Sequence, residues 1–136
     1  MQNDPSEWKS LMPFAALVGV EVSAASATEV RGGLEWQPER CTTGGILHGA
    51  ALMALADSLG AICAFLNVPP GGGTATIESK TNFFRAVRNG RVEATARPLH
   101  VGKTTVVVQT DLMDHEGRRV AQVTQTQAVI AAAVAQ

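Results

Sequence analysis

The feature that most constrains the fold is a long apolar helical segment near the middle of the chain. Residues 47–66 are rich in strong helix formers such as alanine and leucine and contain no proline. A helix of this length extends for about 30 Å and is apolar on nearly every side, so other structure must wrap around it. The segment Val68-Pro-Pro-Gly-Gly-Gly73 then ends the helix.

Strand-like segments lie on both sides of this helix in the sequence. Before it we expect a short helix and two strands, over residues 4–11, 18–22 and 28–36, followed by a loop over 37–45. After it we expect four strands, over residues 74–84, 91–99, 104–113 and 119–130. Asn89-Gly90 and Glu116-Gly117 predict hairpin turns. The sequence therefore predicts an α+β fold, a curved antiparallel sheet wrapped around one helix, with a meander after it.

Composition excludes several classes of protein. A chain of 136 residues predicts one domain, residues 1–136. A formal net charge of −1 and only 4% aromatic residues give no reason to expect nucleic acid or an anionic membrane as a partner. The first eight residues lack the pattern of a signal peptide, and no uncharged apolar stretch reaches 18 residues. Cys41 and Cys63 lack metal-binding spacing, so we expect reduced thiols in a soluble cytoplasmic protein.

One charged residue interrupts the apolar helix. Asp57 lies among alanine, leucine and methionine, and no lysine or arginine occurs between Cys41 and Asn67. A carboxylate that is desolvated there costs free energy unless it is paired or protonated. Either Asp57 reaches solvent or a distant arginine, or it is a functional carboxylate with a perturbed pKa at a cleft or subunit interface.

A glycine-bearing loop, residues 42–49, leads into the start of the same helix. A helix N-terminus offers unpaired N–H groups and a partial positive charge that can polarise a carbonyl, and Gly49 would let such a group approach the backbone. Plain helix capping is the alternative. Gly49 and Asp57 lie about 12 Å apart along one helix, so they cannot both contact the same carbonyl. If both are functional, two chains must share each site, as in a symmetric dimer.

The histidines do not complete a familiar catalytic or metal site. His48 lies nine residues from Asp57, half-way around the helix, and the chain has no Gly-x-Ser-x-Gly motif. His48, His100 and His115 also lack the spacing of metal ligands. We therefore expect neither a catalytic triad nor a metal.

Several motifs, in the same order along the chain, resemble those of the hotdog-fold acyl-CoA thioesterases. Residues 47–58, Leu-His-Gly-Ala-Ala-Leu-Met-Ala-Leu-Ala-Asp-Ser, are similar to the helix motif of the phenylacetate-pathway and 4-hydroxybenzoyl-CoA branch. Residues 14–22, 82–91, 97–105 and 121–126 match further family segments. The resemblance implies a hotdog fold and a substrate that is a thioester of coenzyme A, with no separate cofactor. It also implies a homodimer, and two such dimers could pair into a homotetramer.

The resemblance also implies roles for particular residues. Asp57 falls at the position of the family's catalytic carboxylate, Gly49 at its carbonyl-polarising amide, and His48 at its helix-start histidine. Thr76 matches a strand position near the attacking water. Thr42 stands where relatives have Asn or Gln, and Ala50 stands where they have a second glycine. Threonine has a shorter side chain than Asn or Gln, so the residue that would position the water is where this chain departs from the family pattern.

A second set of residues falls on the segments that hold the substrate. Arg85, Arg88 and Lys103 would suit the phosphates of coenzyme A, and Phe83 and Phe84 favour an aromatic or medium apolar acyl group. The expected substrate-binding residues are Phe83, Phe84, Arg85, Ala86, Arg88, His100, Val101, Gly102, Lys103 and Thr104.

The sequence therefore predicts hydrolysis of an acyl-CoA to a free acid and CoA. Asp57 would act as general base on water or as a nucleophile, and the residues do not decide between these roles. Three alternatives stay open: a non-catalytic acyl-CoA binding protein, a hotdog enzyme that acts on acyl-carrier-protein thioesters, and a dehydratase. The dehydratase would need a His–carboxylate pair that is not evident here.

Overall fold

A computed structural model describes residues 4–133 of the chain. It contains three α-helices, α1 to α3, and six strands, β1 to β6, with two short 3₁₀ turns before α3. In chain order these are α1 Pro5–Leu11, α2 Pro13–Val18, β1 Glu21–Ala25, β2 Val30–Glu35, α3 Gly49–Phe65, β3 Gly73–Phe83, β4 Arg91–Val101, β5 Thr105–Met113 and β6 Arg119–Ile130. No helix within the described range has the length and apolarity needed to cross a membrane.

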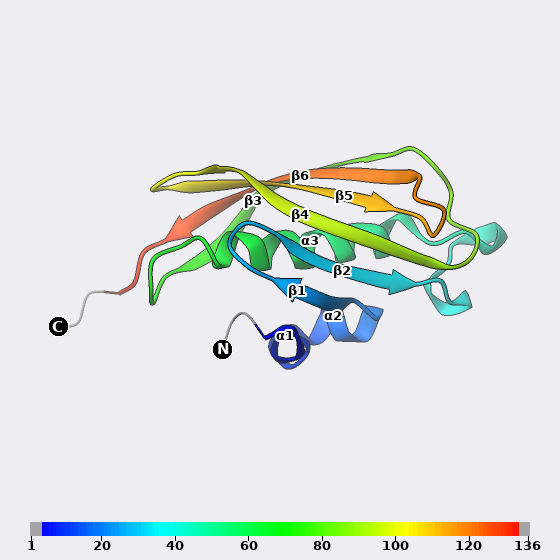
Figure 1. Ribbon diagram of the computed structural model, residues 1–136, viewed down its shortest axis with the longest axis horizontal. Coiled ribbons are helices and arrows are strands. Elements are labelled where there is room, and N and C mark those ends of the chain that lie inside the picture. Colours follow the sequence, from blue (N-terminus) through cyan, green and yellow to red (C-terminus); the bar gives the residue numbers. More distant parts are fainter. Residues whose placement is uncertain (1–3, 134–136) are drawn as a thin grey trace.

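The six strands form one antiparallel sheet in the order β1-β2-β4-β5-β6-β3 (Figure 1). The predicted meander is correct for β4, β5 and β6 but wrong for β3, which crosses over and pairs with β6. Asn89-Gly90 therefore turns a crossover connection and not a hairpin, although Gly90 has the positive φ of 76° that such a turn uses. The predicted hairpin turn at Glu116-Gly117 is confirmed between β5 and β6.

Residues 4–25 agree with the prediction at α1 and differ from it after that helix. Asp4 caps α1 as expected, its carboxylate accepting a hydrogen bond of 3.0 Å from the Ser6 N–H. Residues 18–22 are not one strand, because α2 continues to Val18 and ends at Gly19, which has a φ of 97°. Pro13 at the first helical position favours this second helix, and β1 begins only at Glu21.

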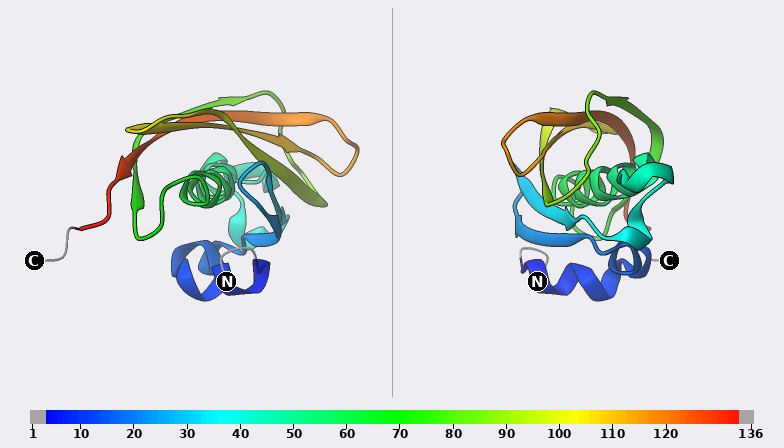
Figure 2. Two further views of the ribbon diagram at one scale, coloured as in Figure 1. Left: turned by 60° about the vertical axis from the view of Figure 1, so that its left-hand side comes forward. Right: turned by 90° about the vertical axis from the view of Figure 1, so that its right-hand side faces the viewer.

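The sheet curves over α3, as predicted, and α1 and α2 lie on the other side of that helix (Figure 2). The helix packs against the sheet through fully buried side chains that include Leu55, Leu59 and Ile62. Cys63 is buried in this core, and burial raises the pKa of its thiol to about 11. The core also takes the inward-facing valines and leucines of β2, β4 and β5.

The expectation that α3 is covered on every side is wrong for one stripe. Ala50, Met53 and Asp57 are exposed, and Met53 keeps 43% of its surface. These residues recur every three or four positions and so share one face of the helix. β3, the neighbouring edge strand, is also largely exposed along its 11 residues. An apolar stripe with one carboxylate in it thus lies beside an unpaired sheet edge.

Candidate active site at the start and open face of α3

The loop before α3 is held in place by hydrogen bonds that fix where the helix begins. The Trp36 indole N–H donates to the Gly45 carbonyl at 3.0 Å, and the His48 N–H donates to the Arg40 carbonyl at 2.9 Å. An isolated antiparallel β-bridge between Cys41 and Leu47 joins the two ends of the loop. The residues predicted to carry chemistry at the helix start are therefore set on a fixed loop.

His48 caps α3 through its side chain. Its Nδ1 accepts a hydrogen bond of 2.9 Å from the Ala50 N–H, so the proton of the neutral ring is on Nε2. The ring borders a groove of about 410 Å³ with Phe14, Leu17 and Cys41 among its lining residues. Within the described chain, the side-chain hydrogen bonds of His48 and Asp57 go to Ala50 and Gln125 and not to each other.

Gly49 is the first residue of α3, and its N–H has no hydrogen-bond acceptor among residues 4–133. The aromatic ring of Phe83 lies against it, because a Cβ at this position would be 3.0 Å from Phe83 Cζ. A pocket of about 380 Å³ opens here. It brings together six of the predicted site residues: Thr42, Gly49, Phe83, Phe84, Arg85 and Ala86.

Asp57 lies two turns further along α3 on its exposed stripe. Its carboxylate forms no ion pair with any described residue, and Oδ1 accepts one long hydrogen bond, 3.4 Å, from Gln125 Nε2 of β6. Although the side chain reaches solvent, the apolar surroundings of the carboxyl group raise its pKa, and the Gln125 amide partly opposes this increase. The carboxylate thus has no counterion among the described residues, reaches solvent and has a raised pKa.

Thr76 lies on the face of β3 that points towards α3. Its hydroxyl accepts a hydrogen bond of 2.8 Å from Gln127 Nε2, and Thr76 and Gln127 are register partners. Ser79 is the register partner of Gln125, the β6 residue that contacts Asp57, so Ser79 lies closer to this contact than Thr76 does.

Gln125, Gln127 and Ser79 were not identified from the sequence as site residues. Both glutamines are 1% exposed, and they occupy the same alternating positions of β6 as the core residues Ala121 and Val123. Polar residues at core positions of a strand are the signal that could have identified them.

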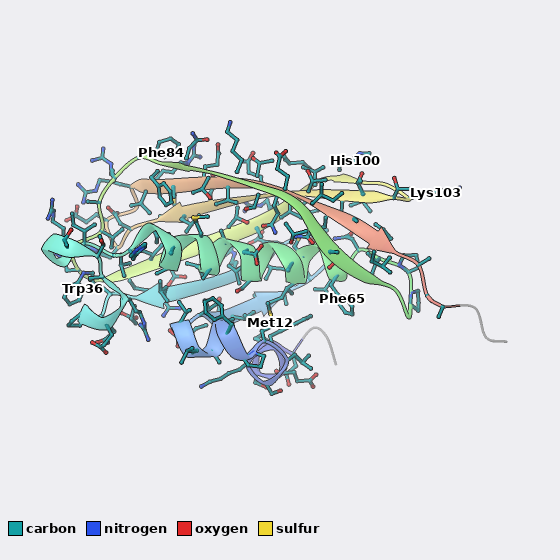
Figure 3. All side chains as sticks on the ribbon, turned by 180° about the vertical axis from the view of Figure 1, so that it is seen from behind. Met12, Trp36, Phe65, Phe84, His100 and Lys103 are labelled. Atoms are coloured by element: carbon teal, nitrogen blue, oxygen red, sulfur yellow. The ribbon has the colours of Figure 1, made fainter. Side chains whose placement is uncertain are left out.

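The two segments predicted to bind coenzyme A lie at opposite ends of the sheet (Figure 3). Arg85 and Arg88 share a basic pocket of about 470 Å³ with His115 and Arg118. The hairpin of His100, Val101, Gly102, Lys103 and Thr104 lies at the far end, where His100 folds over Gly102. One chain therefore does not bring all the predicted substrate-binding residues together. Within residues 4–133, no three His, Cys, Asp or Glu side chains gather as a metal site would require.

Comparison with known families identifies the superfamily of this chain. Residues 44–121, more than half of the chain, match the model of the thioesterase superfamily. The chain belongs to this superfamily, and its architecture is the hotdog fold.

Particular relatives agree with this assignment. The chain is 35% identical over 74 residues to 1,4-dihydroxy-2-naphthoyl-CoA hydrolase of Escherichia coli, and the match covers 54% of each protein. It is 35% identical over 75 residues to a proofreading thioesterase of Cronobacter sakazakii, covering 55% of each. The chain thus spans about half the length of these curated relatives.

Two solved structures are similar over almost the whole chain. A mutant thioesterase from Pseudomonas aeruginosa has a TM-score of 0.89 at 27% identity, covering 96% of both chains. A thioesterase from Haemophilus influenzae has a TM-score of 0.87 at 25% identity, covering 93% of this chain and 90% of the other.

Proposed function

We propose that this protein hydrolyses an aromatic or medium-chain acyl-CoA to the free acid and CoA. The observation that carries the proposal is the Gly49 N–H, which has no acceptor within the described residues and lies at the start of a 17-residue helix beside Phe83. A helix start of this kind stabilises negative charge that develops on a thioester oxygen. The named activity of the Escherichia coli relative, hydrolysis of an aromatic acyl-CoA, supports the same substrate class.

Asp57 supplies the second part of the proposed chemistry. A carboxylate with no counterion and a raised pKa is a stronger base than an ordinary aspartate, so it can take a proton from water near neutral pH. It could equally attack the carbonyl carbon itself and form a mixed anhydride that water then hydrolyses. Both routes need only water and the substrate, with no further cofactor.

A dimer would combine the two parts of the site. Gly49 and Asp57 are separated by about 12 Å along α3, so each site would take Gly49 from one chain and Asp57 from the other. The exposed stripe of α3 and the unpaired edge of β3 lie side by side and are the surfaces that such a dimer would cover. Two such dimers could pair into the tetramer that the resemblance implies.

The same dimer would reunite the proposed coenzyme A residues. If two β3 strands pair in antiparallel orientation, the Phe83 end of one strand lies beside the Gly73 end of the other. Arg85 and Arg88 of one chain would then lie at the same end of the joint sheet as the partner's hairpin of residues 100–104. We propose that these cations bind the phosphates of coenzyme A.

Cys41 and Cys63 are both free thiols, which fits a reducing compartment such as the cytoplasm.

Release of free thiol from benzoyl-CoA, phenylacetyl-CoA, hydroxybenzoyl-CoA and hexanoyl-CoA tests the proposal, with Asp57→Asn as the comparison. We expect turnover of at least one substrate by the wild type and a loss of about 10³-fold or more in the variant. Absence of turnover across the panel, with CoA still bound, would contradict the proposal and favour a carrier-protein substrate or a binding protein.

A further inference from the structure

The side chain of Gln125 is the polar group that contacts Asp57. It projects from β6 onto the inner face of the sheet and is 1% exposed. A buried amide is costly unless its donors and acceptor are satisfied, and a leucine or methionine would fill the same space without that cost. Gln125 nevertheless leaves its Oε1 without a hydrogen-bond donor anywhere in residues 4–133. Core packing alone therefore does not explain why this position holds an amide.

Gly60 makes room for this amide. It faces β6 one turn after Asp57, and a Cβ there would lie 1.9 Å from Gln125 Oε1. Glycine inside a helix costs about 1 kcal/mol relative to alanine, so its presence needs a packing reason. The absent side chain lets the amide lie across the helix, and Nε2 then reaches Asp57 Oδ1 at 3.4 Å.

No other charged or titratable group faces Asp57 from the described elements packed against α3. Asp57 is the one charged residue within the helix, Cys63 is buried in the core, and α2 carries no charge. The helix α1, whose Trp8 ring contacts Phe65 of α3, carries Glu7 and Lys9, and neither forms an ion pair or a hydrogen bond with Asp57. The strands direct every charged side chain to the outer face, as their register partners show. These outward residues are Glu21, Arg31, Glu35, Glu78, Lys80, Arg91, Glu93, Arg97, His100, Asp111 and Arg119.

We infer that Gln125 is a positioning residue for the carboxylate of Asp57, an inference that rests on the proposed function. Donation from Nε2 to Oδ1 fixes the side-chain rotamer and leaves Oδ2 free to take a proton from water or to attack the substrate. A neutral donor suits this task because a lysine or arginine would stabilise the carboxylate strongly and make it a weaker base. Gln125 lies outside residues 44–121, so the superfamily match does not assign it a role.

Kinetics of Gln125→Met over a range of pH test the inference. Without the donor the carboxylate is less stabilised, so the acid limb of the kcat/KM profile moves to higher pH. We expect kcat to fall by about tenfold to a hundredfold as the carboxylate loses its orientation, with KM within about twofold. Gln125→Glu places a second carboxylate beside Asp57 and moves the same limb further in the same direction. Either variant suffices if the other does not fold.

Gln122→Met is the matched control. Gln122 also lies on β6 and also donates to an aspartate, Asp111 Oδ1 at 2.9 Å, but it does so on the outer face. The kcat, KM and pH profile of the Gln122→Met variant should equal those of the wild type. A Gln125→Met protein with an unshifted pH profile and an unchanged kcat would overturn the inference and leave Gln125 as a packing residue.

The titration of Asp57, followed by carboxyl-carbon NMR, separates this inference from the proposed function. The pKa of Asp57 should rise in Gln125→Met and stay unchanged in Gln122→Met, whether or not the acyl-CoA panel contains a substrate. An unchanged pKa of Asp57 in Gln125→Met would overturn the positioning role even if the wild type is an active thioesterase. Absence of turnover in the wild type would instead overturn only the proposed function.

Discussion

Two aspartates of this chain lie in opposite environments. Asp114, in the β5–β6 hairpin, accepts three hydrogen bonds of 2.9 Å, from the N–H groups of Glu116 and Arg118 and from the Arg118 side chain. Asp57 accepts one hydrogen bond, of 3.4 Å, and has no counterion among the described residues. Donors to Asp114 lower its pKa, whereas apolar surroundings raise that of Asp57.

The contrast separates a structural carboxylate from a candidate catalytic one. Three hydrogen bonds use most of the acceptor capacity of Asp114 and hold it in the charged form, which orders the turn. Asp57 keeps most of its acceptor capacity for another molecule and is less stable when ionised. A carboxylate that receives few hydrogen bonds and no counterion from the fold is a stronger base, and hence a better candidate for a catalytic role.

The largest expected effect is on activity. Asp57→Asn should lower kcat by about 10³-fold or more, whereas Asp114→Asn should leave kcat within about twofold and lower the Tm. The comparison uses kcat because Asp114 lines the pocket of Arg85 and Arg88, where a change in charge affects KM. Thiol release and thermal unfolding of both variants check this prediction. Equal losses of activity in the two variants would break the distinction between the two aspartates.

A smaller effect on activity is expected from Gly60→Ala. The added methyl group displaces the Gln125 amide from Asp57, so kcat should fall by about tenfold. Stability should change by less than about 1 kcal/mol, because the gain in helix propensity offsets the repacking. The control is Gln122→Met, whose side chain lies on the outer face of β6 and contacts Asp111 and not Asp57. A fully active Gly60→Ala protein would show that Asp57 does not depend on the amide.

The fold was predictable where one local pattern decides the structure. The long helix and β6 were expected close to their observed bounds, because helix formers in one and alternating residues in the other act over many positions. The order of the strands was not predictable in this way. β3 pairs with β6 and not with its sequence neighbour β4, and this pairing depends on how the whole sheet closes over α3.

The candidate site divides in the same way. Asp57 was identified from the sequence because it is the one charged residue in a long apolar helical segment. Gln125 was missed because it is 68 residues away, and its contact with Asp57 exists only through the register of β6 and the space above Gly60. The uncovered stripe of α3 was also unpredictable, since an apolar sequence does not state which face the sheet leaves open.

The two aspartates should also give opposite pH dependences of stability. Because the folded-state pKa of Asp57 is raised, its ionised form costs stability, and the cost disappears as pH falls through that pKa. The lowered pKa of Asp114 stabilises the fold above the unfolded-state pKa, and this stabilisation is lost as pH falls through the folded-state value.

Urea unfolding at constant protein concentration checks this pair of signs. At about pH 8, Asp57→Asn should be more stable than the wild type and Asp114→Asn less stable. Both differences should shrink towards about pH 3, below the ordinary carboxyl pKa. A wild type that equals Asp57→Asn at every pH would show that the surroundings of Asp57 do not penalise its charge.

The smallest effect is expected at the ion pair beside Asp114. Arg118 contacts Asp114 and, at 2.8 Å, the exposed carboxylate of Glu116. Exposed ion pairs contribute at most about 1 kcal/mol and are screened by salt, so Glu116→Gln should lower the free energy of unfolding by no more than this. The Glu116 N–H still donates to Asp114 in the variant, so the hairpin should persist. A larger loss would mean that the ion pair between Glu116 and Arg118, and not the backbone donors to Asp114, is the main interaction that holds the hairpin.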